Sequence, residues 1–238
     1  MKQLEQLLYD GIVNEINQSH RVQFKYLMIF RIFAAIFMTF ALIQVSVVTP
    51  TFSQNFLYLT LWGGYITYFY FGLVSIENFS FYKLNKQFFN DSMWKFCHIL
   101  FIVAFCFEIP ILIIYWSYIF PQDNVHTINQ WLINVDVHFL SCILIFIDFI
   151  LNDIQFQLKQ SLALIVIAII YLIVNMFYVL VTGIEIYPGI NWRNGISYII
   201  SIITLGIMFG VFQLGLLYQN KIKKKLMMNK QEKQLMIE

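Results

Sequence analysis

Six apolar runs of about 20 residues each dominate the sequence, and each is long enough to cross the roughly 30 Å hydrocarbon core of a bilayer as a helix. Inside lipid every backbone polar group needs an internal partner, so the runs predict helices and not open strands or loops. Only 12% of the residues are charged, about half the share of a soluble domain. The sequence therefore predicts an all-α, polytopic membrane protein, a bundle of six transmembrane helices over Tyr26–Val48, Asn55–Ile76, Trp94–Phe120, Trp131–Leu151, Ser161–Thr182 and Gly195–Tyr218.

Polar segments flank this transmembrane domain, which we assign to residues 26–218. Residues 1–25 carry apolar positions at helical spacing and favour an amphipathic helix on the membrane surface. Residues 219–238 form a lysine-rich tail, typical of a solvated stop-transfer flank.

The distribution of basic residues predicts the orientation. With six spans both termini share one side, and almost all lysines and arginines then fall on that side, whereas Arg193 alone falls on the other. By the positive-inside rule we expect both termini to be cytoplasmic in an integral, multi-pass protein of an endomembrane or the plasma membrane. The basic residues on the terminal side are Lys2, Arg21, Lys25, Arg31, Lys83, Lys86, Lys95, Lys159 and the lysines at 221, 223, 224, 225, 230 and 233.

Several partner and cofactor classes find no support. The net charge of +2 is small and no basic, aromatic-studded face exists, so we expect no nucleic-acid binding. Cys97, Cys106 and Cys142 lie in apolar runs without a CxxC pair and are predicted to be buried thiols. No set of His, Asp and Glu residues has the spacing of a recognised metal motif, so we expect neither a metal nor another cofactor. We expect membrane lipids to be the partners of the protein.

The fourth run carries polar side chains at membrane depth, where each costs a few kcal/mol and usually faces a bundle interior or a wet cavity. At about 100° per residue, Asn134, His138, Ser141 and Asp148 share one broad side of the predicted helix, while Asp136 lies off it. Such a side is either a buried functional site or a packing network.

A threonine of the second run lies at the depth of this histidine. Thr60 and His138 are both within about two turns of the same membrane surface, and a hydroxyl beside an imidazole can form a nucleophile and base pair, with Asn134 as a support. The structural alternatives are a Thr60 bond to the carbonyl of Phe56 and a cross-helix hydrogen bond of His138.

Other polar residues favour structural roles. Glu108 lies beside Pro110 at mid-membrane, and we expect it to pack against a buried polar group such as Asn175. We expect Asp148 to cap the polar network at the cytoplasmic end of its helix. His98, near an interface, and His126, in an outer loop, are expected to be solvated.

The outer loop GIEIYPGINWRN contains Tyr187 and Trp192, which are predicted to be interfacial aromatics, with a turn at Pro188 and Gly189 between them. The loop is either a lid over the level of Thr60 and His138 or an ordinary aromatic belt.

Three segments in order resemble the FAR-17a/androgen-induced membrane protein family, whose studied animal members hydrolyse fatty acid esters of hydroxy fatty acids. They are YLTLWGGYITYFYFG with Thr60, WLINVDVHFLSCILIFID with Asn134, His138 and Asp148, and GIEIYPGINW with Tyr187. The resemblance covers about residues 55–218. It implies a threonine hydrolase of lipid esters with Thr60 as nucleophile, His138 as base, and Asn134, Asp148 and Tyr187 as supporting residues.

Two other interpretations stay open. The LTLW and YP-x-x-NW segments are also similar to rolling-stone-like membrane proteins, which favours a non-enzymatic multi-pass protein of that kind or an accessory subunit of a membrane complex. In that case Thr60 faces a helix or lipid, with no cavity between it and His138. A transporter is the third interpretation, although the sequence lacks the paired interrupted helices typical of that class.

Overall fold

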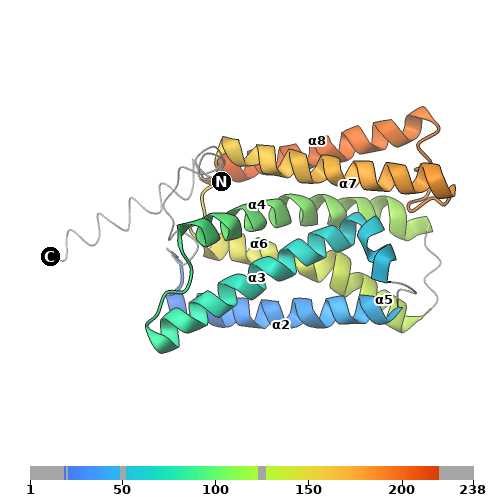
Figure 1. Cartoon of the computed structure of the whole chain (residues 1–238). Helices are drawn as coiled ribbons and strands as arrows, with labels where there is room; N and C mark the ends of the chain where they lie inside the picture. Colours follow the sequence, from blue (N-terminus) through green and yellow to red (C-terminus); the bar gives the residue numbers. More distant parts are fainter. Residues whose placement is uncertain (1–18, 20, 49–51, 123–126, 220–238) are drawn as a thin grey trace.

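The computed structural model describes residues 19, 21–48, 52–122 and 127–219, and within these ranges the chain is helical, without strands (Figure 1). Six helical segments are long and apolar enough to cross a membrane. The prediction of an all-α, six-helix, multi-pass membrane protein is therefore confirmed. The predicted amphipathic segment at residues 1–25 and the basic tail at 219–238 lie almost entirely outside the described residues.

Four of the spans are continuous α-helices, and two contain a wider turn. The third span runs through α4, a π-helical segment (η3) and a short 3-10 turn, and the fourth runs through α5, a π-helical segment (η5) and α6. The bounds are α2 Phe24–Val48, α3 Leu59–Leu84, α4 Asp91–Ile114, η3 Tyr115–Ile119, α5 Ile128–Val135, η5 Asp136–Leu140, α6 Ser141–Leu151, α7 Ser161–Thr182 and α8 Gly195–Tyr218.

The second span differs most from the predicted Asn55–Ile76. A 3-10 turn, Phe52–Leu57, precedes α3, and α3 continues to Leu84, where Asn85 takes a left-handed conformation and ends it. The extension buries Glu77, whose carboxylate accepts hydrogen bonds from the backbone N–H groups of Phe88 and Phe89 at 3.0 and 3.1 Å. Glu77 can therefore be buried on α3, because the loop that follows the helix folds back and supplies hydrogen-bond donors to its carboxylate.

Helix α4 is the centre of the bundle. It packs against α3, α6, α7 and α8, and in Figure 1 it lies between the α7–α8 pair and the group of α2, α3 and α6. In its most apolar stretch 67% of the residues are buried, compared with 28% for both α7 and α8. The three cysteines are free and buried, as predicted. Helices α7 and α8 therefore present most of their surface to lipid.

The two ends of the bundle are easily distinguished. Arg21, just before α2, donates a hydrogen bond to the hydroxyl of Tyr218 at the end of α8, so both lie at one end. Thr60, at the start of α3, lies at the opposite end. We refer to these as the Tyr218 end and the Thr60 end.

An ion pair buried in the bundle ties three helices together. Arg31 of α2 donates from Nε and Nη2 to the two carboxylate oxygens of Asp148 on α6, at 2.8 and 3.2 Å, and both side chains are 0% exposed. The hydroxyl of Tyr70 on α3 and the amide of Asn152 also donate to Asp148, at 2.5 and 2.9 Å. Arg31 lies toward the Tyr218 end, the side to which the basic residues were assigned, and its partners lie inside the bundle, about 10 Å beyond the start of α2.

Removing one member of this pair leaves the other charge buried without its partner. We expect Arg31→Leu and Asp148→Leu each to cost about 3–5 kcal/mol of folding free energy, and the double variant to cost less than the sum of the two, because it leaves no orphaned charge. Thermal unfolding of the purified protein in detergent measures this. Single variants as stable as the unaltered protein would contradict the account.

Candidate active site

The start of α3 is fixed by aromatic side chains from other elements. The side chain of Tyr58, the residue before α3, does not cap the helix. Instead, the backbone N–H of Leu59 donates to the hydroxyl of Tyr187, in the loop after α7, at 2.8 Å. Tyr171 of α7 donates to the carbonyl of Leu57 at 3.1 Å. These contacts hold the first turn of α3, and Thr60 with it, against α7 and its loop.

Thr60 lies beside His138. The Oγ1 atom of Thr60 is 3.4 Å from Nδ1 of His138, and Thr60 is largely buried. The distance is somewhat longer than the usual reach of about 2.6–3.2 Å for a nucleophile and base, and such contacts are often looser before substrate binds. The carbonyl of Phe56, the alternative partner for Thr60, accepts the indole N–H of Trp62 at 2.8 Å.

His138 lies in a π-helical turn that faces another π-helical turn. It belongs to η5, and its ring stacks on that of Tyr115, the first residue of η3, with ring centroids 3.3 Å apart and planes 5° from parallel. Single π-helical turns inside α-helices are frequent at functional sites. The stacked phenol ring fixes the plane of the imidazole, a role that the sequence did not suggest for Tyr115.

Two of the three predicted supporting residues make no hydrogen bond with the pair in the described part of the chain. Within the described residues, Asn134 makes no hydrogen bond with Thr60 or His138. Asp148 is ten residues beyond His138, about 15 Å along the helix, where it binds Arg31. The predicted shared side is observed for His138, Ser141 and Asp148, which all contact other helices inside the bundle.

Tyr187 is the supporting residue that reaches the site. Its hydroxyl accepts the N–H of Leu59 at 2.8 Å and lies near the side chains of Tyr171 and Thr60. Burial raises the pKa of Tyr187 above its ordinary value, although these neighbouring polar groups oppose the shift. The phenol therefore stays protonated at neutral pH and can donate.

The loop after α7 positions this tyrosine. The predicted turn at Pro188 and Gly189 is confirmed: the N–H of Ile190 donates to the carbonyl of Tyr187 at 3.1 Å, and Gly189 has a φ of 76°, which a glycine adopts without strain. The hydroxyl of Tyr118 on η3 donates to the carbonyl of Pro188 at 3.1 Å. The loop is thus attached to both α3 and the end of the third span.

Trp192 is not the interfacial aromatic that the sequence predicted. It is 6% exposed, and its indole N–H donates to Oδ1 of Asn175 on α7 at 2.8 Å. The Nδ2 group of Asn175 donates to the hydroxyl of Tyr171 at 3.3 Å. One end of this amide therefore attaches the loop to α7, and the other end is held by Tyr171 of the same helix.

The expected packing of Glu108 against a buried polar group is observed, but with partners other than Asn175. Glu108 is fully buried and accepts hydrogen bonds from Thr67 of α3 at 3.0 Å and from Ser141 of α6 at 2.7 Å. Gly63, one turn beyond Thr60, makes room for it: a Cβ atom there would lie 3.1 Å from Oε1 of Glu108 and 2.8 Å from Cδ1 of Ile111.

His98 also differs from expectation. It is 1% exposed rather than solvated, and its Nε2 donates to the carbonyl of Gln155 at 2.8 Å. His126 lies outside the described residues. Among the residues that are described, no group of three His, Cys, Asp or Glu side chains is arranged to hold a metal ion.

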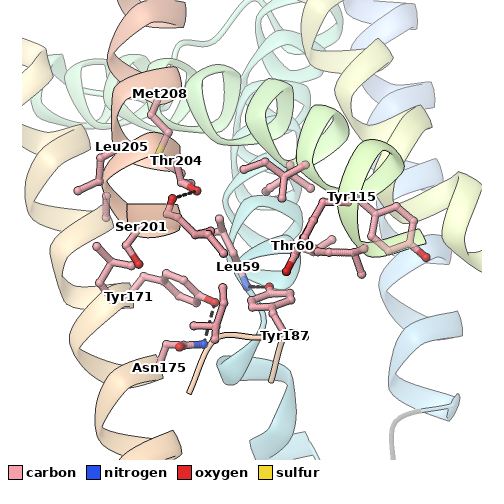
Figure 2. A pocket seen from close by; sticks show the side chains of 18 of the residues that line it. Leu59, Thr60, Tyr115, Tyr171, Asn175, Tyr187, Ser201, Thr204, Leu205 and Met208 are labelled. Atoms are coloured by element: carbon pink, nitrogen blue, oxygen red, sulfur yellow. Dashed lines mark hydrogen bonds between the residues drawn. The ribbon is translucent and has the colours of Figure 1, made fainter. Parts of the chain in front are cut away.

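A cavity opens beside Thr60, between α3, α4, α7 and α8 and beneath the loop after α7 (Figure 2). The cavity has a volume of about 70 Å³. Its lining is apolar apart from a few hydroxyl and amide groups, and it includes Thr60, Tyr115 and Tyr187. His138 is not part of the lining; the Tyr115 ring stacked on it is.

Comparison of the chain with protein-family models, with curated proteins and with solved structures finds no match. The class of the protein, an integral membrane bundle of six helices with a polar pair at the edge of an apolar cavity, therefore follows from its own sequence and structure.

The contact at Gly63 leads to a paired test. We expect Gly63→Ala to cost about 1–3 kcal/mol of stability, because the added methyl group displaces Ile111 and Glu108. At the adjacent Gly64 a Cβ atom would meet only Leu42, at an ordinary 3.6 Å, so Gly64→Ala should be neutral or stabilising by up to about 1 kcal/mol. Thermal unfolding in detergent compares the two variants, and equal stability would contradict the close packing at Gly63.

Proposed function

We propose that this protein is an integral membrane hydrolase of lipid esters, with Thr60 as nucleophile and His138 as general base. The observation that carries the proposal is the 3.4 Å approach of Thr60 Oγ1 to His138 Nδ1 at the edge of an apolar cavity. The resemblance to the FAR-17a/androgen-induced family in the segments around these residues supports it, and suggests fatty acid esters of hydroxy fatty acids as substrates.

In the first half of the reaction the unprotonated Nδ1 of His138 takes the proton of the Thr60 hydroxyl. The Thr60 oxygen forms a bond to the acyl carbon, and the ester C–O bond breaks. The departing alkoxide receives the proton from His138 and leaves as an alcohol. The product of this step is an acyl ester of Thr60.

In the second half a water molecule attacks the acyl carbon while Nδ1 takes one of its protons. The bond between the acyl group and Thr60 breaks, and the proton returns to the threonine oxygen. A free fatty acid leaves, and both residues regain their starting state. Thr60, His138 and water accept and supply every proton that the reaction transfers.

Negative charge on the ester oxygen has two stabilising groups nearby. Thr60 is the second residue of α3, so the positive end of the helix dipole lies at the reacting atoms. The hydroxyl of Tyr187 accepts the N–H of Leu59, which leaves its own proton for donation toward the site. We assign Tyr187 to oxyanion stabilisation.

We also propose that the Tyr218 end faces the cytoplasm. The exposed lysines Lys25, Lys83, Lys86 and Lys159 lie in or beside helix ends on that side, whereas Arg193 lies at the Thr60 end. The positive-inside rule then directs both termini to the cytoplasm and the active site to the opposite leaflet.

Hydrolysis by the purified protein tests the assignment. With a long-chain ester as substrate, we expect Thr60→Ala and His138→Ala each to lower kcat/KM by at least about 10³-fold, because the two residues act as one unit. Thr60→Ser keeps a hydroxyl and should retain measurable turnover. Unchanged hydrolysis in both alanine variants, with intact folding, would contradict the proposal and favour a non-enzymatic protein.

The role of Tyr187 predicts a second pair of variants. Tyr187→Phe should lower kcat by about 10²-fold with a smaller change in KM, because a transition-state hydrogen bond is lost. Tyr118→Phe is the matched control: it removes a hydrogen bond to the same loop, at Pro188, without touching Thr60. An equal loss of kcat in both variants would assign the effect of Tyr187 to loop attachment and contradict oxyanion stabilisation.

A further inference from the structure

The cavity beside Thr60 adjoins a second hollow on the exposed side of α7 and α8, and the two share part of their lining. This groove, which offers about 250 Å³, is lined by residues of both helices and by Trp192. Leu172, Ser201, Leu205 and Trp192 line the groove and the cavity alike. They form the boundary between the active site and the outside of the bundle.

The groove opens on exposed parts of two membrane-spanning helices, so in a bilayer it faces the hydrocarbon interior. Its outer residues include Ile173 and Ile202, which are 54% and 66% exposed on membrane-spanning helices. Figure 1 shows α7 and α8 side by side along one flank of the bundle. Because exposed isoleucines at this depth contact lipid, whatever enters the groove is an apolar chain from the bilayer.

The polar groups between the groove and Thr60 are already used within the protein. The hydroxyl of Ser201 donates to the carbonyl of Ser197 at 2.8 Å. The hydroxyl of Thr204 donates to the carbonyl of Ile200 at 2.9 Å (Figure 2). Asn175 is occupied at both ends by Trp192 and Tyr171. Such a path offers apolar contacts and no hydrogen bonds to a headgroup, and its polar end is at Thr60 and Tyr187.

We propose that an acyl chain of the substrate lies in the groove between α7 and α8 and passes the boundary at Leu172, Ser201 and Leu205, so that its ester carbonyl reaches Thr60. This inference rests on the proposed hydrolase function. It assigns the substrate as an ester with a long, unbranched acyl chain taken from within the bilayer, and it makes the size of residue 201 a determinant of chain length.

Two alkyl fluorophosphonates with the same reactive group, one carrying an ethyl chain and one a hexadecyl chain, test this with the full-length protein in lipid nanodiscs. Each forms an Oγ–P bond to a reactive threonine and releases fluoride and a proton. Thr60→Ala defines background labelling. The measured quantity is the ratio of the hexadecyl to the ethyl labelling rate.

Larger side chains in the path should lower that ratio. We expect Ser201→Leu, at the boundary, and Ile173→Trp, in the groove, each to reduce it by about tenfold or more. Ile203→Trp is the matched control, because Ile203 is 55% exposed on α8 and lines neither hollow, and it should keep the unaltered ratio. Size-exclusion chromatography establishes that each variant is folded.

The outcomes separate the two claims. A ratio unchanged in both path variants, with Thr60-dependent labelling intact, overturns the acyl-chain path and leaves the hydrolase proposal standing. An equal fall of the ratio in Ile203→Trp also overturns the path, because the effect would not be specific to it. Absence of Thr60-dependent labelling by both probes in the unaltered protein overturns the hydrolase proposal, and the path with it.

Discussion

The buried pairing of Asp148 with Arg31 and Tyr70 is the interaction on which the site depends. A charge inside a bilayer needs a charged or hydrogen-bonding partner, so α2, α3 and α6 meet at one register. Tyr70 and Asp148 are 78 residues apart in the sequence, and so are Thr60 and His138. Helices α3 and α6 run in the same direction, and the register that satisfies Asp148 therefore also brings Thr60 opposite His138.

A second polar contact maintains this register between the two. Glu108 of α4 accepts from Thr67 and Ser141, one on α3 and the other on α6, at a level between the ion pair and the candidate site. The central helix α4 thus links α3 and α6 through the carboxylate of Glu108. The opposite wall is formed by α7 and α8, and it is there that the apolar groove opens.

The sequence predicted the spans well because hydropathy and length are the constraints that a bilayer imposes, and the limits of α7 and α8 agree residue for residue. It also brought Thr60 and His138 to one depth. It did not predict the π-helical turns at η3 and η5, which bring Tyr115 against His138. The contact of Tyr115 with His138 had no distinguishing signal among 14 tyrosines. The count of basic residues assigned Arg31 to one side of the membrane, but such a count cannot identify a partner on another helix.

The central claim is that Thr60 becomes acylated during turnover. The most direct measurement is peptide mass spectrometry of the unaltered protein, quenched in acid while it hydrolyses a chromogenic long-chain ester. The account predicts an acyl group on the side-chain oxygen of Thr60, and its disappearance when the quench is delayed until the substrate is exhausted. Steady hydrolysis with the acyl group on a different residue would contradict the account.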